Sequence, residues 1–300
     1  MKNILLLILF SIFIFGCNKN SEKNIEEPTN PLESILHKMD YYVRDSISPA
    51  DDIPECSFYE IHTNILSLDR NTIFKYITEE INSFKPNYPD KPDYDTEKKT
   101  VRLSIIFSIL STNLVPLKTL FLENLDTNKN YLSAAWGLAA MGRDGIPYLL
   151  EALSNPSEKI REMAVCGLAG SLGSSDIEGS VADKIQTALL PYLKHQSSDV
   201  RYHAIIGIGK YCTDPDLCAS ELLDRVQNDP EIGLRFTAIR SLRKILDRFK
   251  IDNSEINNII LNISNNDQEN ELVRIEAKKF LKIPITPSDP IRRKLLQNNE

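Results

Sequence analysis

Val200-Arg201-Tyr202-His203-Ala204 is one of six copies of a short pattern that recurs through the last two thirds of this 300-residue chain. In five of the six copies the pattern opens with an apolar residue followed by arginine, and its fifth position is alanine in five copies. The six copies end at Ile105, Ala134, Ala164, Ala204, Ala238 and Ala277, so they are 29 to 40 residues apart. Repetition at this period is typical of a solenoid, because one unit cannot bury its apolar face alone and must stack on its neighbours.

Each copy is expected to open a helix, and a second helix follows it. In four copies the alanine is followed three residues later by glycine or serine, which places two small side chains on one helical face. The backbones of two neighbouring helices can approach closely where these small side chains meet. The second helices are expected at 115–122, 146–153, 185–193, 217–226 and 256–263, with Pro116 and Pro147 near a first turn, where proline is tolerated. The sequence therefore predicts antiparallel helix pairs over residues 96–283.

The two ends of the repeat region differ from it in composition. Residues 31–95 are expected to form a helical cap, because Ile65, Leu68, Ile73, Ile77 and Ile81 recur at helical intervals. Three prolines between 86 and 92 cannot continue a helix and should mark the end of this cap. Residues 284–300 are expected to form a C-terminal tail. A polar cap is what a solenoid needs at its end to stay soluble.

The apolar-arginine pair, the alanine three residues after the arginine and the Ile146-Pro147 opening of a second helix resemble HEAT repeats. They are most similar to the short bacterial HEAT-like units first named in bilin lyases. The resemblance implies an all-α, right-handed α-α superhelix whose second helices line the concave side. Tyr131 replaces the arginine in the second copy, and Ile105 replaces the alanine in the first. Resemblance at the level of the fold assigns no activity.

The N-terminus is expected to carry an export signal. A largely apolar run of 12 residues follows Lys2, whereas about 20 are needed to span a bilayer. The run ends in Gly16-Cys17, which resembles the lipobox of bacterial lipoproteins, although Phe15 departs from that motif. Residues 1–16 are thus expected to be a signal peptide, Cys17 to be lipidated, and 17–30 to be a flexible tether. A plain signal peptide or an uncleaved anchor is the alternative. The expected location is the bacterial cell envelope, and Asn18 favours the outer membrane because it lacks an acidic retention charge.

The net charge of −7 argues against nucleic acid as a partner, because affinity for it depends on neutralising phosphates. No cofactor is expected. Four cysteines remain besides Cys17, and Cys212 and Cys218 flank a turn that a disulfide could close. Their alternative role is as small buried hydrophobes. No metal site is expected, since no cysteine has a CxxC neighbour and the four histidines are scattered. Neither His195 nor His203 stands in a catalytic motif.

The recurring arginines are expected to bond the preceding turn or an acceptor in a neighbouring repeat. Asn155 and Asp229, each six residues before an arginine, are suitable partners for Arg161 and Arg235. A basic cluster on one helix is expected to be a solvated face. It comprises Arg240, Arg243, Lys244, Arg248 and Lys250.

Four residues of the second helices are candidates for binding a protein partner. Tyr148, Glu151, Glu221 and Asp224 are expected to face outward. An aromatic residue beside carboxylates would suit a partner with an apolar anchor and a basic rim. A solvated face with one exposed tyrosine is the alternative.

Two functions of different classes follow from these features. The favoured one is a lipid-anchored scaffold for protein–protein interaction without catalysis. The alternative is an enzyme-associated, ligand-binding or nucleic-acid-binding role like those of other HEAT-like proteins, such as bilin lyases and alkylpurine DNA glycosylases. A cytosolic location would favour the alternative.

Overall fold

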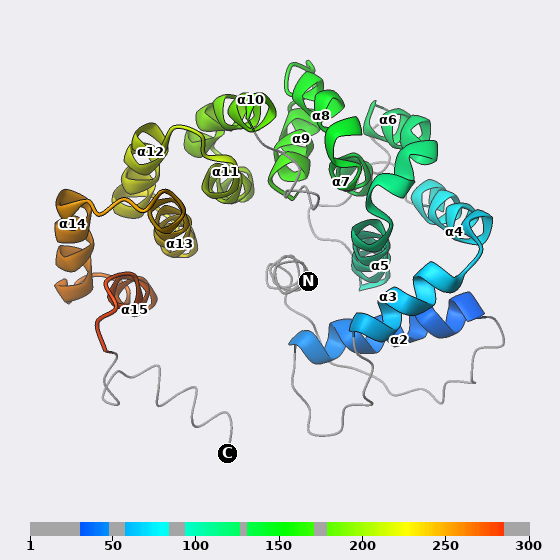
Figure 1. Cartoon of the computed structure of the whole chain (residues 1–300), viewed down its shortest axis with the longest axis horizontal. Helices are drawn as coiled ribbons and strands as arrows, with labels where there is room; N and C mark the ends of the chain where they lie inside the picture. The colour runs from blue at the N-terminus through cyan, green and yellow to red at the C-terminus, as the bar shows by residue number, and fades with distance from the viewer. Residues whose placement is uncertain (1–30, 48–57, 84–93, 127–130, 171–178, 285–300) are drawn as a thin grey trace. The chain divides into compact units, whose positions relative to one another are not determined.

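The computed structural model describes residues 31–47, 58–83, 94–126, 131–170 and 179–284 (Figure 1). All regular secondary structure in these ranges is helical, so the chain is an all-α helical solenoid, as the sequence predicts. The chain divides into two compact units, residues 1–177 and 178–300. Cys17, the tether at 17–30, the prolines between 86 and 92, and most of the tail at 284–300 lie outside the described residues.

The first unit contains eight of the α-helices that the structure describes. They are α2 (Pro31–Ile47), α3 (Phe58–Ser67), α4 (Arg70–Ser83), α5 (Tyr94–Leu110), α6 (Lys118–Asp126), α7 (Tyr131–Ala140), α8 (Ile146–Ala152) and α9 (Glu158–Gly170). The short 3-10 helices η1 (Ser111–Leu117) and η2 (Gly142–Asp144) precede α6 and α8. α2 and α3 pack on α5, and the buried side chains of Ile61 and Ile65 contribute to this packing.

The helical structure is interrupted between α3 and α4, in the middle of the isoleucine pattern. The Asp69 carboxylate accepts a hydrogen bond from the backbone N–H of Thr72 at 3.0 Å, and so begins α4. Ile73, Ile77 and Ile81 are buried on α4. The five-residue step from Leu68 to Ile73 is the place where the period shifts, and it coincides with the break.

The second unit contains the remaining described helices. They are α10 (Ser180–Leu189), the 3-10 helix η4 (Leu190–Lys194), α11 (Ser198–Tyr211), α12 (Pro215–Asn228), α13 (Ile232–Phe249), α14 (Ser254–Asn265) and α15 (Glu271–Phe280). Side-chain caps begin three of them. Asp214, Asn253 and Asn270 accept backbone N–H groups at the starts of α12, α14 and α15. α13 ends at Lys250, which adopts the left-handed conformation at φ 55°.

The helices of each unit form two rows. The helices that contain the recurring pattern form the first row: α5, α7 and α9 in the first unit, and α11, α13 and α15 in the second; in α5 the pattern lies in the middle of the helix and not at its start. Neighbours within the first row pack directly on one another, while second-row helices pack mainly on first-row helices. Within each unit, Figure 1 shows the first row on the inner side of the curve and the second row on the outer side.

This arrangement differs from the sequence-based expectation in two respects. The second helices were expected on the concave side, but in both units they lie on the outer side. Each second-row helix also packs chiefly along the pattern helix that follows it, so α12 lies along α13 rather than along α11. The physical reason is the small residues of the pattern, which let first-row helices approach each other and close the inner side of the curve.

Close approach is visible at two glycines. A Cβ placed on Gly209 of α11 would lie 2.7 Å from the Ser241 Cβ of α13, and one on Gly167 of α9 would lie 2.9 Å from the Ala135 oxygen of α7. Neither distance leaves room for a side chain. The small residues are therefore required by the packing of consecutive first-row helices, as the sequence predicts.

The pattern alanines should not tolerate enlargement. Ala204 is fully buried in the first row, whereas Glu151 on α8 is exposed. We expect Ala204→Leu to lower the free energy of unfolding by about 1–3 kcal/mol through overpacking. Glu151→Leu should change it by less than about 0.5 kcal/mol. Urea unfolding followed by circular dichroism measures both, and equal effects would show that the helix faces are assigned wrongly.

Candidate functional site

The recurring arginines bind backbone carbonyls of the turn that precedes their own helix. Arg161 Nη1 donates to the carbonyl oxygens of Asn155 at 2.7 Å and Pro156 at 2.9 Å. Arg235 Nη1 donates to the carbonyl oxygen of Asp229 at 2.9 Å. The prediction that Asn155 and Asp229 are the partners is confirmed, although the backbone oxygen accepts in both cases.

In the second unit the same arginines also reach the next repeat. Both oxygens of the Asp229 carboxylate accept from Arg201, at 2.9 and 3.0 Å, and this carboxylate is fully buried. Arg235 Nη2 bonds the Glu269 carboxylate at 2.7 Å. The guanidinium groups are thus occupied in joining one repeat to the next, and they do not form an exposed anion-binding row.

The four candidate partner-binding residues lie on second-row helices, two in each unit. In the first unit, Tyr148 is half-buried and its hydroxyl lies 3.3 Å from the Lys118 amine, while Glu151 is exposed. In the second unit, Lys194 pairs with Glu221 at 3.3 Å. Hydrogen bonds from Arg225, and then from Asn228, lower the pKa of Asp224. Two of the four residues thus lie in each unit. Tyr148, Glu221 and Asp224 each contact another side chain of their own unit.

Cys212 and Cys218 lie together as buried thiols in the second unit. The Cys218 thiol donates a hydrogen bond to Gln186 Oε1 at 3.2 Å, and a hydrogen bond between the two cysteines lowers the pKa of Cys212 and raises that of Cys218. Gln186 Oε1 also accepts the backbone N–H groups of Thr213 and Asp214, and so holds the start of α12. Oxidation of the pair to a disulfide stays a prediction.

The histidines of the second unit are engaged within it. His195 lies between η4 and α11, where its Nδ1 accepts the backbone N–H of Ser197 at 3.1 Å. The ring of His203 packs edge-on against Tyr202, with centroids 5.3 Å apart. Burial lowers the pKa of His203 to about 4, against the opposing effect of the Asp199 carboxylate. The His203 imidazole is therefore neutral at pH 7.

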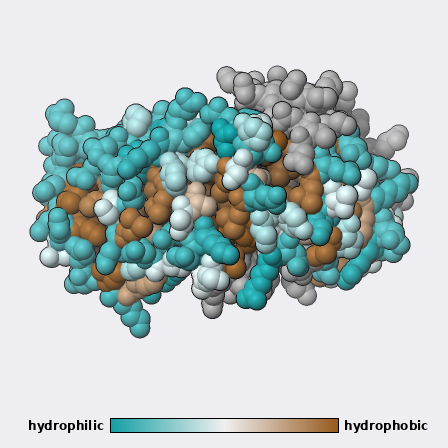
Figure 2. All heavy atoms as spheres, turned by 90° about the horizontal axis from the view of Figure 1, so that it is seen from above, coloured by the Kyte–Doolittle hydropathy of each residue, from teal (hydrophilic) through white to brown (hydrophobic). Residues whose placement is uncertain are grey.

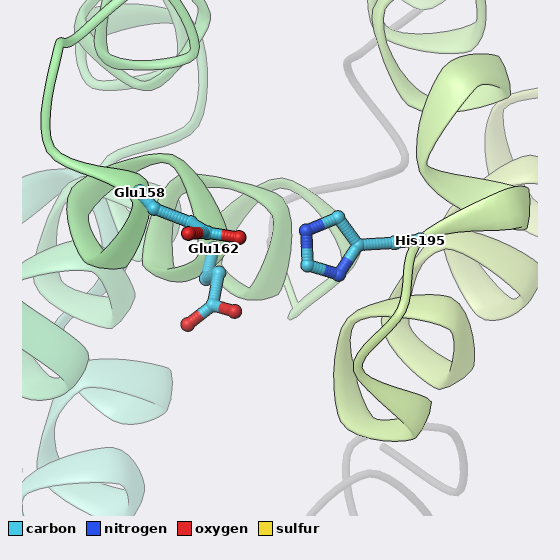
Figure 3. A group of neighbouring side chains, drawn as sticks. All are labelled: Glu158, Glu162 and His195. Atoms are coloured by element: carbon cyan, nitrogen blue, oxygen red, sulfur yellow. The ribbon is translucent and has the colours of Figure 1, made fainter.

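Glu158 and Glu162 stand one turn apart on α9 (Figure 3). Glu162 is paired with Lys159 at 3.6 Å. These carboxylates belong to the first unit, whereas the His195 ring drawn beside them belongs to the second. The three residues therefore do not make up a site of either unit.

Formal charge is segregated between the two rows of the second unit. On the first row, α13 carries five Arg and Lys against Asp247, a net charge of +4, and α11 and α15 carry +1 each. On the second row, α12 carries −2, α14 carries −1, α10 is neutral and η4 carries +1. The first-row helices are thus net positive, although Arg201 and Arg235 are paired with acidic residues of the turns and the whole chain has a net charge of −7.

The side chains of this basic side form one connected group across three helices. We call it the inner surface, and it comprises Tyr202, Lys210, Phe236, Arg240, Lys244 and Lys279. The Arg240 guanidinium stacks 4.2 Å from the Phe236 ring centre and bonds Glu276 on α15 at 3.0 Å. The Lys279 amine lies 3.4 Å from the same carboxylate. Burial, and then the charge of Lys244, lower the pKa of Lys210 to about 8.

Sequence reasoning finds two of the six residues of this surface, Arg240 and Lys244. The basic run on α13 was recognised and interpreted as a solvated face, but Tyr202, Lys210 and Lys279 were not connected with it. Formal charge summed helix by helix would have provided a signal. The sequence does not show which helices lie in the same row, because that depends on tertiary packing.

The second-row side has a different character. Seen from above, hydrophobic residues reach the surface in narrow bands between hydrophilic side chains (Figure 2). Among the large exposed hydrophobic residues of the second unit, Leu217 and Leu261 lie on the second-row helices α12 and α14, whereas Ile232 and Leu272 lie on the first-row helices α13 and α15. Scattered apolar residues of this kind are normal on a protein surface. In the part of the chain that the structure describes, no helix combines the length and apolar character that crossing a bilayer requires.

Comparison with known proteins supports the repeat assignment. Residues 149–243 match the family described as HEAT repeats. The matched range begins in α8 and ends in α13, so it contains three second-row helices and the first-row helix that follows each of them. No curated protein matches the chain. The chain therefore carries HEAT-like repeats, and it is a helical repeat scaffold.

Proposed function

We propose that this protein is a lipid-anchored scaffold of the bacterial cell envelope that binds a protein partner through its helical repeats and performs no catalysis of its own. One observation carries the proposal. The residues of the recurring pattern serve the packing of the stack, as Arg201, Ala204 and Gly167 do. The positions that vary between repeats are left to define the exposed faces.

An extended series of helix faces suits a macromolecular partner better than a small molecule. Small-molecule sites are concave pockets with convergent polar groups. Here the arginines and histidines that could supply such groups are bonded within each unit. A scaffold with its binding residues spread over several helices is the function that this arrangement supports best.

The anchor is proposed from the sequence. Gly16-Cys17 ends an apolar segment of 12 residues, and the polar stretch after Cys17 would let the folded units stand off the membrane. Asn18 favours the outer membrane. We expect Cys17→Ala to shift the protein from the membrane to the soluble fraction, while Cys56→Ala leaves it in the membrane. A Cys17→Ala protein that stays in membranes with otherwise unchanged mass would refute the anchor.

Binding is tested by crosslinking in living cells. The anchored wild-type chain should capture a discrete protein, and that capture should be reproducible under stringent washing. A chain that captures no protein in its own envelope would refute the scaffold function. A cytosolic location would instead favour the ligand-binding or nucleic-acid-binding alternative.

A further inference from the structure

We propose that the inner surface of the second unit binds an acidic, extended segment of a protein partner. This inference rests on the proposed scaffold function and names the surface and the chemistry of the partner. It is carried by the segregation of charge between the rows and by the contacts that gather the inner surface from α11, α13 and α15.

Electrostatic complementarity is the first argument. The three first-row helices together carry six more positive than negative charges, and the second-row elements carry two more negative than positive ones. An acidic segment is therefore attracted to the inner side and repelled from the outer side. Complementary potentials of this kind steer association and select partners.

The positive groups of the inner surface are crowded. The charge of Lys244 acts on Lys210, and that of Arg240 acts on Lys244, and each interaction lowers the pKa of the lysine concerned after the larger effect of burial. Like charges held close in a partly buried place repel one another, and nearby anions such as the Glu276 carboxylate beside Arg240 lower that cost. Carboxylates of a bound segment would relieve this repulsion.

Aromatic side chains lie beside the cations. The Arg240 guanidinium stacks on the Phe236 ring, and the Tyr202 ring lies close enough to Arg240 for that charge to act on the tyrosine pKa. Tyrosine and arginine supply much of the binding energy in protein interfaces. The surface thus offers apolar contact to the stems of acidic side chains as well as charge to their carboxylates.

The other polyanions fit this surface less well. A bilayer is flat at this scale and cannot follow the inner side of a curve. Nucleic acid is bound in proportion to the phosphates that are neutralised, and a chain with a net charge of −7 offers few cations for a long polyphosphate. A single extended peptide can lie along the inner side and meet all three helices.

The test measures binding of the full chain, kept in detergent, to a labelled oligoglutamate peptide by fluorescence anisotropy. Lys244 and Lys279 are exposed, so Lys244→Glu/Lys279→Glu should leave the fold intact, which circular dichroism verifies. We expect this double variant to bind at least about tenfold more weakly. The matched control, Lys184→Glu/Lys194→Glu, makes the same charge change on the second row and should alter affinity less than about twofold.

Two results would overturn the inference. One is an equal loss of affinity in both double variants, which would reflect net charge alone. The other is tighter binding to oligothymidylate or to phosphatidylglycerol vesicles than to oligoglutamate. If Lys244→Glu/Lys279→Glu captured the same protein in cells with undiminished yield, the inner surface would be refuted and the scaffold function would stand. Failure of the wild-type chain to capture any protein would refute the scaffold function instead.

Discussion

Replacing Asp229 with alanine should lower the free energy of unfolding of the second unit by about 3–5 kcal/mol, because it leaves a buried charge without its partner. The Arg201 side chain is only 8% exposed and donates two hydrogen bonds to the Asp229 carboxylate, which is fully buried. The same carboxylate accepts the backbone N–H of Glu231 at 3.0 Å and lies 3.7 Å from Arg225. All of these donors lose their acceptor in Asp229→Ala.

A matched control is available near the C-terminal end of the same helix. Asp224 also bonds Arg225, but its side chain is 37% exposed, so Asp224→Ala should cost less than about 1 kcal/mol. Urea unfolding followed by circular dichroism compares the two variants. Asp229→Leu combined with Arg201→Met should recover much of the loss, because both charges are removed together. Equal stability of the two single alanine variants would mean that the buried pair contributes no more than a surface pair.

We expect Gly145→Ala to destabilise the first unit by about 3 kcal/mol, at the upper end of the range for overpacking. Gly145 precedes α8, and a Cβ on it would lie 1.8 Å from the Leu138 carbonyl oxygen of α7. That contact is with backbone, so no side-chain rotation can relieve it. The loop and the start of α8 would have to move away from α7.

The single tryptophan of the chain provides the measurement. Trp136 lies on α7, so its fluorescence during urea unfolding reports on the first unit. Gly233→Ala is the control, and circular dichroism follows it because Gly233 lies in the second unit; apart from its own helix backbone and chain neighbours, no atom lies within 4 Å of its Cβ position. At an exposed helical position the change from glycine to alanine should be neutral or stabilising by up to about 1 kcal/mol. Unfolding of Gly145→Ala at the wild-type urea concentration would show that α8 does not dock on α7 in this way.

Gly145→Ala and Asp229→Ala test the two kinds of contact that hold the repeats together. Small residues set how closely consecutive helices approach, and arginine–carboxylate pairs tie one repeat to the next. Both devices repeat along the chain, so neither distinguishes one repeat from another. The charge of the first row does distinguish them, since α13 is far more basic than α11 or α15. We therefore place the partner on α13 and its neighbours rather than on the recurring residues.

Periodicity within the chain was sufficient to predict the helices and the solenoid. The five second helices predicted from sequence overlap α6, α8, α10 with η4, α12 and α14. The hydrogen bonds from Arg161 and Arg235 to residues six positions earlier were also predictable. Such features depend on spacings of a few residues, which helical geometry converts directly into contacts.

Tertiary packing alone decided the rest. The pairing of α12 with α13, the bond between Arg201 and Asp229 across 28 residues, and the gathering of Tyr202, Arg240 and Glu276 on one side depend on which faces of separate helices meet. An amphipathic pattern shows which face of a helix is buried, but it does not show which neighbour covers that face. The sequence by itself therefore determined the helices and the repeats, whereas the tertiary structure decided which side is concave and basic.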